Sequence, residues 1–213
     1  MKNFYKNKKI LVTGHSGFKG SWLCLWLKFM GSNVLGISNK NYQNSSHFNQ
    51  LNLKMKTKYE DIRNKKKINK IIRLFKPDII FHLAAQSLVK KGHQNPSLTF
   101  DVNINGTLNI LDSVKSLKKK IVIVNVTSDK CYKNDAKKRA FREDDKLGGD
   151  DPYSLSKALS EMLTMNYQKL YKNKKIFIAS ARCGNVIGGG DWSEDRIIPD
   201  LVKSIIKKKI VKI

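Results

Sequence analysis

The side chains in this sequence best suited to chemistry are Tyr153 and Lys157, which lie four residues apart in the segment YSLSK. At the start of a helix, this spacing places both side chains on one face. An ammonium beside a phenol stabilises the phenolate and lowers the pKa of the tyrosine from about 10 towards neutral pH. Such a phenolate can take the proton of a sugar hydroxyl while a hydride leaves the same carbon. In a lysine-rich chain, a surface pair is the alternative interpretation.

A glycine-rich segment, GHSGFKG at residues 14–20, is the second motif that could do chemistry. It follows a short apolar run at 9–13 and precedes a segment, 17–30, whose apolar residues have helical spacing. Glycine allows a tight turn and a close approach of the backbone to a pyrophosphate, and the following helix N-terminus supplies N–H groups and a positive dipole end. Lys19 could add a point charge there. The segment predicts a dinucleotide site, with an ordinary strand-to-helix turn as the alternative.

The second predicted strand, 33–37, bears on which dinucleotide would bind. Sites of this kind usually place an acid at the end of that strand, where it holds the ribose 2′-hydroxyl. Here the strand is followed by Ser38, Asn39 and Lys40, so the acid is missing. Lys40 would even tolerate a 2′-phosphate, and the sequence leaves both NAD and NADP open.

Strands and helices that alternate along the chain are expected to position these motifs. Strands are predicted at 9–13, 33–37, 78–83, 121–126 and 176–181, and helices at 17–30, 64–75, 96–117 and 152–171. Between 38 and 58 we expect a long loop with a short helix and a short strand. This order predicts a doubly wound parallel sheet, and the apolar run 121–124 predicts burial on both sheet faces. The apolar face of the helix at 17–30 is expected to carry Phe18, Trp22, Leu25, Trp26 and Phe29.

Length and composition limit the class of protein. The chain has 213 residues, of which 40% are hydrophobic, and this suits one domain with a sizeable core. No apolar run approaches the roughly 18 residues of a membrane span, and the first residues, MKNFY, do not resemble a signal peptide. Three scattered cysteines favour a reducing, cytoplasmic setting without a disulfide framework. The four histidines form no pair at metal-ligand spacing, so no metal site is expected.

The net charge of +25 first suggests a nucleic-acid partner. Only six of the 42 basic residues are arginine, however, and the lysines occur in short runs beside apolar segments. Recognition of phosphates and bases favours arginine forks and aromatic stacking, and no such motif accompanies the charge. Compositional drift is therefore the favoured interpretation, and no nucleic-acid or membrane partner is expected.

In order and spacing, the motifs resemble the extended short-chain dehydrogenase/reductase family. The matching segments are TGxxGFxG at 13–20, Asp61-Ile62, HLAAQ at 82–86 and YxxxK at 153–157. The resemblance implies a Rossmann domain that binds NAD, with the adenine near Asp61 and the ribose and pyrophosphate along 83–85. The implied cofactor contacts are Gly14, Gly17, Phe18, Lys19, Gly20, Asp61, Ile62, Leu83, Ala84, Ala85, Tyr153 and Lys157.

Longer segments resemble the branch of this family that dehydrates CDP-glucose. They are GHSGFKGSWL at 14–23, TSDKCY at 127–132, LGGDDPYS at 147–154 and GNVIGGGDW at 184–192. The resemblance implies oxidation of the sugar at C4, elimination of water across C5 and C6, and return of the hydride to C6. Simple epimerases of the family lack the Asp129-Lys130 pair, so this pair favours dehydration over epimerisation.

The same resemblance implies catalytic roles. Tyr153 would be the base at the C4 hydroxyl, with Lys157 tuning it and holding the nicotinamide ribose, while Ser128 hydrogen-bonds to the C4 oxygen. Asp129 would be the acid that protonates the departing C6 hydroxyl, which requires a pKa raised by burial. Lys130 would be the C5 base, which requires a neutral amine whose pKa is lowered by burial and neighbouring positive charge.

Three further residues are expected to bind CDP-glucose. Gln86 would meet a sugar hydroxyl, following the HLAA segment. Asn185 and Arg196 would meet the nucleotide-sugar phosphates, Arg196 through a bidentate contact. Asp191 and Trp192 would shape the same loop, although structural packing explains them equally well.

Residues 1–182 are predicted to form the NAD-binding domain, and residues 183–213 the beginning of a smaller substrate-binding region. Chains of this family are considerably longer, and 210–213 reads as the start of a strand, so we expect a truncated chain. The resemblance also suggests a homodimer through the helices at 96–117 and 152–171. Three hypotheses stay open: an active dehydratase with an incomplete sequence, a fragment that binds NAD without turnover, and a basic nucleic-acid-binding protein on a Rossmann frame.

Overall fold

A six-stranded parallel sheet forms the centre of the computed structural model, which describes residues 2–39, 47–135, 139–172 and 174–210. The strands are β1 (Lys9–Thr13), β2 (Asn33–Ser38), β3 (Lys56–Tyr59), β4 (Ile79–His82), β5 (Ile121–Val126) and β6 (Ile176–Ala181). Their order in the sheet is β3-β2-β1-β4-β5-β6. This is the doubly wound Rossmann order, which places a crevice at the carboxyl ends of β1 and β4, where the winding reverses.

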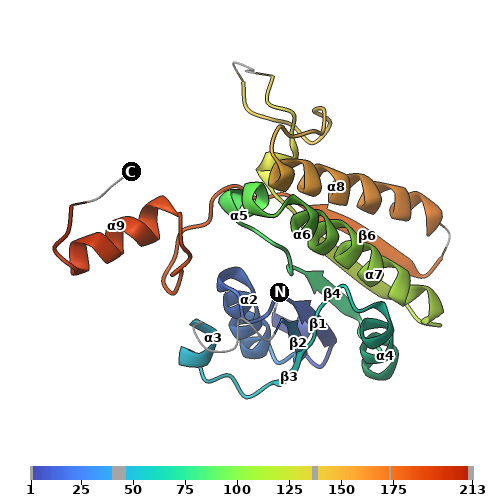
Figure 1. The fold of residues 1–213 in the computed structure, drawn as a ribbon. Coiled ribbons are helices and arrows are strands. Elements are labelled where there is room, and N and C mark those ends of the chain that lie inside the picture. Colours follow the sequence, from blue (N-terminus) through green and yellow to red (C-terminus); the bar gives the residue numbers. More distant parts are fainter. Residues whose placement is uncertain (1, 40–46, 136–138, 173, 211–213) are drawn as a thin grey trace.

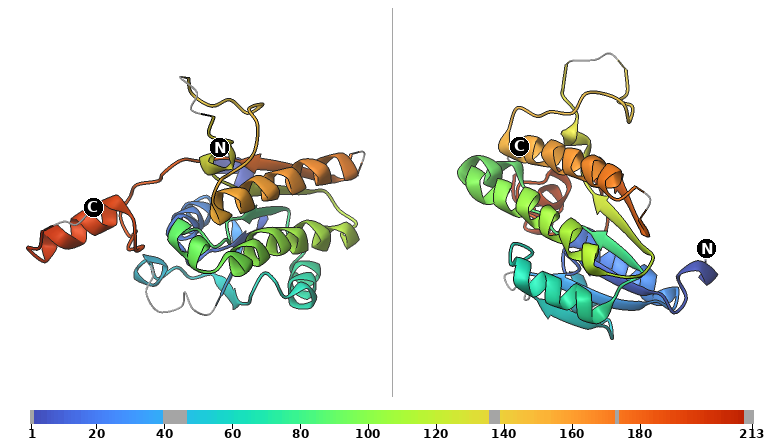
Figure 2. Two further views of the ribbon diagram at one scale, coloured as in Figure 1. Left: turned by 45° about the horizontal axis from the view of Figure 1, so that its top comes forward. Right: turned by 90° about the vertical axis from the view of Figure 1, so that its right-hand side faces the viewer.

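Helices cover both faces of the sheet (Figures 1 and 2). α2 (Phe18–Phe29) packs on one face against β1 and β2. On the other face lie α4 (Lys65–Phe75), a composite helix that contains α6 (Pro96–Phe100) and α7 (Gly106–Ser113), and α8 (Pro152–Leu170). Shorter helices are α1 (Lys2–Tyr5), α3 (His47–Gln50) and α5 (Val89–Gln94), and α9 (Ile197–Ile206) follows the last strand.

The predicted fold class is confirmed, and every predicted strand is present with boundaries within one residue. The short helix and strand expected between 38 and 58 are α3 and β3. The short helices α1 and α5 were not predicted, and neither was α9. The prediction about Lys40 lies outside the described residues. The strand expected at 210–213 lies outside them as well except for Ile210, which has no regular structure.

The helix predicted at 96–117 is not uniform. Between α6 and α7 the backbone forms a π-helical turn, η2 (Asp101–Asn105), and a 3-10 turn, η3 (Val114–Ser116), ends the rod. A π turn holds one extra residue without breaking the helix, so the apolar spacing could not indicate it. It coincides with Asn103, whose side-chain amide donates to the carbonyl of Gln86 and to the Ser156 hydroxyl.

The predicted apolar face of α2 is not the face that packs on the sheet. Trp22, Trp26 and Phe29 are 43%, 59% and 71% exposed. A β-carbon at Gly20 would overlap the carbonyl oxygen of Gly14, so the helix approaches the sheet through its small residues. The buried residues of α2 are Gly20, Ser21, Cys24 and Leu27.

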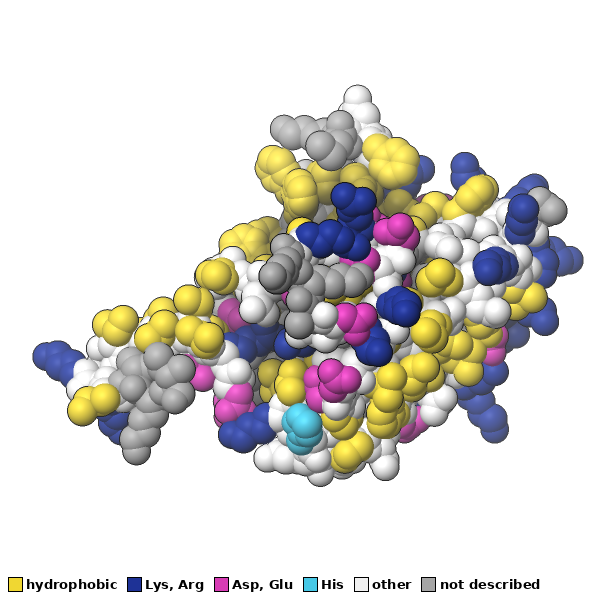
Figure 3. Space-filling model, turned by 90° about the horizontal axis from the view of Figure 1, so that it is seen from above, with side chains coloured by type: hydrophobic (Ala, Val, Ile, Leu, Met, Phe, Trp, Pro, Cys, Tyr) yellow, Lys and Arg dark blue, Asp and Glu magenta, His cyan; other side chains and the backbone are white. Residues whose placement is uncertain are grey.

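One face of the β5–β6 half of the sheet is only partly covered. Ile121 and Ile123 are buried, but Val122 and Val124 on the opposite face are only half-buried, and Phe177 on β6 is 51% exposed. The predicted burial of β5 on both faces is therefore wrong for the face that carries Val122 and Val124. Apolar side chains also gather over α9, at the left of Figure 3, while basic side chains on that face are scattered among acidic and apolar ones.

None of the helices of the described residues is long and apolar enough to cross a membrane. No cluster of three His, Cys, Asp or Glu among those residues is arranged to hold a metal ion.

A buried histidine joins the central strands to the composite helix. His82 ends β4 and is 3% exposed. Its Nδ1 lies 2.7 Å from Thr13 Oγ1, and its Nε2 lies 3.1 Å from Thr107 Oγ1. Burial and the charge of Lys157 lower the pKa of His82 to about 3. His82 is therefore a core residue with both ring nitrogens partnered.

This histidine makes stability depend on pH. Because the pKa of His82 is about 3 when folded and 6.5 when unfolded, the unfolded chain binds the proton first as pH falls. As pH falls from 6 to 4, we expect His82 to lower the free energy of unfolding by about 1.4 kcal/mol per pH unit. Denaturant titrations of His82→Gln across this range should give a shallower pH slope. His93→Gln, at an exposed position, should keep the original slope; equal slopes for all three proteins would contradict the assignment.

Candidate active site

One cavity of about 1570 Å³ lies at the carboxyl ends of the strands. Loops after β1, β3, β4, β5 and β6 and the first turns of α8 contribute to its lining. It is lined by all of the residues predicted to bind cofactor or substrate or to act chemically: Gly14, Gly17, Phe18, Lys19, Gly20, Asp61, Ile62, Leu83, Ala84, Ala85, Gln86, Ser128, Asp129, Lys130, Tyr153, Lys157, Asn185 and Arg196. The parallel topology thus brings residues as far apart in the sequence as Gly14 and Arg196 to one site.

The glycine loop has the backbone geometry that its sequence predicts. Gly14 has a φ of +73°, and a β-carbon there would lie 2.8 Å from the backbone nitrogen of Ala84. Gly17 is the N-cap of α2 and has no side chain that could cap the first turn. The loop therefore brings bare backbone and a helix N-terminus to the cavity wall, which suits a phosphate group.

Tyr153 lies in the first turn of α8, where Asp151 caps the helix by accepting from the backbone N–H of Tyr153 at 2.9 Å. The phenol is 8% exposed, and this burial raises its pKa. A hydrogen bond with Ser128 and the charge of Arg196 oppose that rise. The predicted lowering of the Tyr153 pKa is therefore wrong for the chain alone, because desolvation of the phenol outweighs these favourable groups.

Lys157 lies one helical turn further along α8 and is 6% exposed. Burial, together with the charge of Lys19, lowers the pKa of Lys157 to about 8. The Lys19 ammonium donates to Cys183 Sγ at 3.2 Å. The Lys19 side chain therefore reaches the part of the cavity near Cys183 and Lys157. It was expected to meet phosphates at the glycine loop.

Asp129 and Lys130 follow β5 in a 3-10 turn, η4 (Asp129–Cys131). The Ser128 hydroxyl donates to Asp129 Oδ1 at 3.0 Å and accepts from the Lys130 backbone N–H at 3.3 Å, which fixes the start of the turn. Both side chains reach the cavity wall, but both are exposed. The described residues therefore do not bury Asp129 and Lys130 as expected.

Comparison with known proteins agrees with this geometry. Residues 11–212 match the protein family described as GDP-mannose 4,6 dehydratase. The chain belongs to this family. Its resemblance to extended short-chain dehydrogenases/reductases, inferred from the motifs, is confirmed.

Individual relatives support the same family. The chain is similar to the CDP-glucose 4,6-dehydratase of Salmonella typhimurium, with 43% identity over 95% of this chain and 59% of that protein. An epimerase of Methanothermobacter thermautotrophicus has a TM-score of 0.87 and 26% identity over 99% of this chain and 62% of its own. The dTDP-glucose 4,6-dehydratase of Bacillus anthracis, solved in complex with NAD, has a TM-score of 0.78 and 25% identity over 96% and 63%. The chain spans less than two thirds of each of these relatives.

The three residues predicted to bind substrate differ in whether their side chains are already used in hydrogen bonds within the chain. The Gln86 side chain donates to the Leu88 carbonyl and to Thr99 Oγ1 and accepts from the Leu88 N–H at 2.6 Å. These bonds shape the loop after β4, so the expected sugar contact of Gln86 is not supported. Asn185 is exposed at the cavity. Nε of Arg196 is buried and, within the described residues, has no hydrogen-bond partner, which suits an anionic ligand.

A buried ion pair that was not predicted joins α8 to segment 127–132. Glu161 on α8 is fully buried, and Arg182 Nε, just after β6, donates to it at 3.1 Å. The Thr127 hydroxyl also donates to Glu161, and Arg182 donates to the Tyr132 hydroxyl at 2.9 Å. The pair thus joins α8 to both ends of segment 127–132. The only signal in the sequence was a carboxylate one turn after Lys157.

Other residues of the cavity were also missed. Ser38, His47, Arg63 and Cys183 line it, and the ring centroid of His47 lies 4.6 Å from that of Trp22. His47 is held by the Ser21 hydroxyl at 2.8 Å. None of these belongs to a motif, so only the folded chain identifies them.

Breaking the buried Glu161–Arg182 pair should destabilise the fold more than breaking an exposed ion pair. Glu161→Gln leaves Arg182 without its buried counter-charge, and we expect the free energy of unfolding to fall by about 3 kcal/mol. Glu60→Gln, which breaks the exposed pair with Lys67, should cost less than about 1 kcal/mol. Denaturant titration of both variants measures this difference. Equal, small losses would show that the buried pair is not needed to hold the fold.

Proposed function

We propose that this chain binds NAD and that the protein is a CDP-glucose 4,6-dehydratase, a hydro-lyase that forms CDP-4-dehydro-6-deoxyglucose and water. The observation that carries the proposal is the single cavity in which the glycine loop, the Tyr153–Lys157 pair and Asp129-Lys130 meet. The 43% identity to the Salmonella typhimurium enzyme supports CDP-glucose as the substrate.

The residues of the cavity fit a dinucleotide. Gly14 and Gly20 leave the backbone open where β-carbons would block a close approach, and α2 points its N-terminus at the same place. In the proposal, Asp61 and Ile62 lie at the adenine, and Leu83, Ala84 and Ala85 follow the ribose and pyrophosphate. NAD is favoured over NADP because the similar Bacillus anthracis enzyme was solved with NAD. When bound, the cofactor accepts a hydride from C4 of the sugar and returns it to C6.

Tyr153 is proposed to remove the proton of the C4 hydroxyl as that carbon is oxidised. The Ser128 hydroxyl hydrogen-bonds to the same oxygen, and the Lys157 ammonium favours the phenolate and binds the nicotinamide ribose. The pKa of about 8 keeps Lys157 largely protonated at neutral pH, as this role requires. The charge of Arg196 also favours the phenolate, because it opposes the rise that burial causes in the Tyr153 pKa.

Lys130 and Asp129 are proposed to carry out the elimination. The neutral Lys130 amine takes the C5 proton, the C5–C6 double bond forms, and Asp129 protonates the C6 hydroxyl as it leaves as water. The hydride then returns to C6 and a proton to C5. Because both side chains are exposed in the chain alone, the proposal requires bound substrate to exclude water around them.

The remaining assignments complete the proposal. Arg196 and Asn185 bind the phosphates of CDP-glucose, and Gln86 positions the loop beneath the sugar. A homodimer through α6–α7 and α8 belongs to the proposal, and the exposed apolar residues of α8, Leu155, Met162 and Met165, support it. A cytoplasmic setting is supported by three free cysteines.

A second candidate is a fragment that binds NAD without turnover, since the chain spans 59% of the Salmonella typhimurium enzyme. One experiment separates the candidates: purified protein is mixed with NAD and CDP-glucose, and the alkaline absorbance of a 4-keto-6-deoxy sugar is followed. Product supports the dehydratase, and NAD binding without product supports the fragment. Tight, salt-dependent DNA binding without cofactor affinity would instead support a nucleic-acid-binding protein.

Lys130→Ala tests the assignment of the C5 base. We expect C4 oxidation to continue, seen as reduced cofactor and a 4-keto sugar that retains its C6 hydroxyl, while elimination slows by about a hundredfold or more. Lys133→Ala, an exposed lysine in the same segment, should dehydrate at the normal rate. Normal dehydration by Lys130→Ala would mean that another group removes the C5 proton.

A further inference from the structure

The segment 183–190, which follows β6, forms part of the cavity wall and rests on the first turns of α2. The Lys19 ammonium donates to Cys183 Sγ at 3.2 Å, where the segment begins. One turn further along α2, the indole N–H of Trp22 donates to the carbonyl of Gly189 at 2.9 Å. These contacts join α2 to both ends of the segment, and we call residues 183–190 the strap.

Consecutive glycines let the strap lie close to aromatic rings. A β-carbon at Gly188 would lie 3.2 Å from Cζ of Phe18, and a β-carbon at Gly190 would overlap the His47 ring. Gly190 also has a φ of +83°, in the region that favours glycine. The glycines at 188–190, to which the motif analysis gave no role, therefore allow a close fit between the strap and helices α2 and α3.

Trp22 reaches the cavity through the strap. The strap contributes residues 183–187 and Gly190 to the lining, whereas Trp22 is absent from the described residues that line the cavity. Its side chain is 43% exposed, and its ring centroid lies 4.6 Å from that of His47. Trp22 is therefore placed to set the position of the strap without touching a ligand in the cavity.

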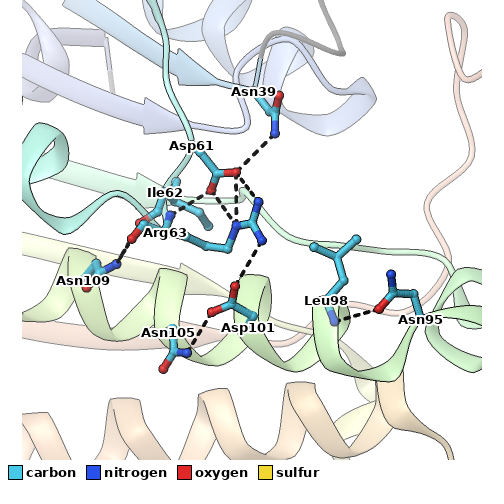
Figure 4. A network of polar contacts seen from close by, with 9 residues as sticks. All are labelled: Asn39, Asp61, Ile62, Arg63, Asn95, Leu98, Asp101, Asn105 and Asn109. Atoms are coloured by element: carbon cyan, nitrogen blue, oxygen red, sulfur yellow. Dashed lines mark hydrogen bonds and ion pairs between the residues drawn. The ribbon is translucent and has the colours of Figure 1, made fainter.

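The wall of the cavity that follows β3 is held more firmly (Figure 4). Arg63 donates through Nη2 to Asp61 Oδ2 at 2.7 Å and through Nη1 to Asp101 Oδ2 at 3.0 Å, which ties this wall to the composite helix. Hydrogen bonds between two charged groups are about twice as strong as neutral ones. The strap rests on α2 through one neutral hydrogen bond, one lysine–thiol contact and the aromatic rings, so its contacts with α2 can be released at a smaller cost.

We propose that Trp22 is a positioning residue that holds the strap beside the bound dinucleotide and slows its release. Phe18 and Lys19 belong both to the glycine loop, where the pyrophosphate is proposed to lie, and to the contacts with the strap. A ligand at the glycine loop is therefore bordered by the strap on this side. The inference rests on the proposed function, in which a hydride taken from C4 is returned to C6, so the reduced dinucleotide must stay bound between the two steps.

The test measures how fast NADH leaves the purified chain. Bound NADH is chased with excess NAD, and the loss of its fluorescence is followed. Trp22→Phe keeps a ring beside His47 but removes the donor to Gly189, so we expect release to be about fivefold faster, as the loss of one hydrogen bond allows. Gly190→Ala forces a β-carbon against the His47 ring and should speed release by about tenfold or more.

Trp26→Phe is the matched control. It makes the same exchange on α2, at a position that is 59% exposed and has no hydrogen bond to the strap among the described residues. We expect this variant to release NADH at the original rate. An equal acceleration by Trp26→Phe would mean that any change to α2 has this effect, and would overturn the proposal.

The association rate of NADH separates positioning of the strap from damage to the dinucleotide site. In Trp22→Phe this rate should not fall, because a loosened strap opens the cavity more readily. A slower association in a folded Trp22→Phe protein would mean that Trp22 shapes the site itself, and would overturn the proposal.

Failure of the inference and failure of the proposed function give different results. If the original protein binds neither NAD nor NADH, the proposed function fails. If it binds them but Trp22→Phe releases NADH at the original rate, the role of Trp22 is overturned while dinucleotide binding stands. Should thermal denaturation show that Trp22→Phe is unfolded, Gly190→Ala, which leaves α2 unchanged, decides the question. Release at the original rate from that variant would then overturn the inference.

Discussion

The first turn of α2 packs directly on the turn that ends β1, and at Gly20 no space remains for a β-carbon. This contact of backbone on backbone determines which side of α2 faces the sheet and leaves its tryptophans outside. It also sets the position of the helix N-terminus at the carboxyl ends of β1 and β4, where the winding of the sheet reverses. The shape of the dinucleotide half of the cavity follows from that placement.

The half of the cavity around Tyr153 and Lys157 depends on buried polar groups that tie α7 and α8 to the sheet. His82 joins β4 to Thr13 and Thr107, and Glu161 joins α8 to Thr127 and Arg182. A buried polar group without a partner is costly, so each member fixes the others. Tyr153 and Lys157 are held by this framework at the same cavity as the glycine loop. Proposed cofactor binding and proposed proton transfer thus share one rigid support.

Sequence reasoning identified the fold because buried parallel strands have an unmistakable apolar run, as at β1 and β5, and because glycine spacing has a backbone cause. The face of α2 that packs on the sheet could not be predicted from apolar spacing, because that spacing does not show that large side chains are excluded where Gly20 contacts Gly14. The Glu161–Arg182 pair could not be predicted, since its members are 21 residues apart in the sequence and belong to no motif. The Tyr153 pKa was misjudged because desolvation depends on packing, which spacing alone does not reveal.

We propose that the close approach of Gly14 and Gly20 builds a dinucleotide site in the cavity that contains Lys157. Calorimetric titration of NAD into the purified chain, the Gly20→Ala variant and the Gly189→Ala variant tests this proposal. A β-carbon at Gly189 would meet no atom within 4 Å. We expect one NAD per chain for the original protein and for Gly189→Ala, and a loss of binding in a folded Gly20→Ala protein. Absence of binding to the original protein, or equal affinity for Gly20→Ala, would show that this approach does not build the site.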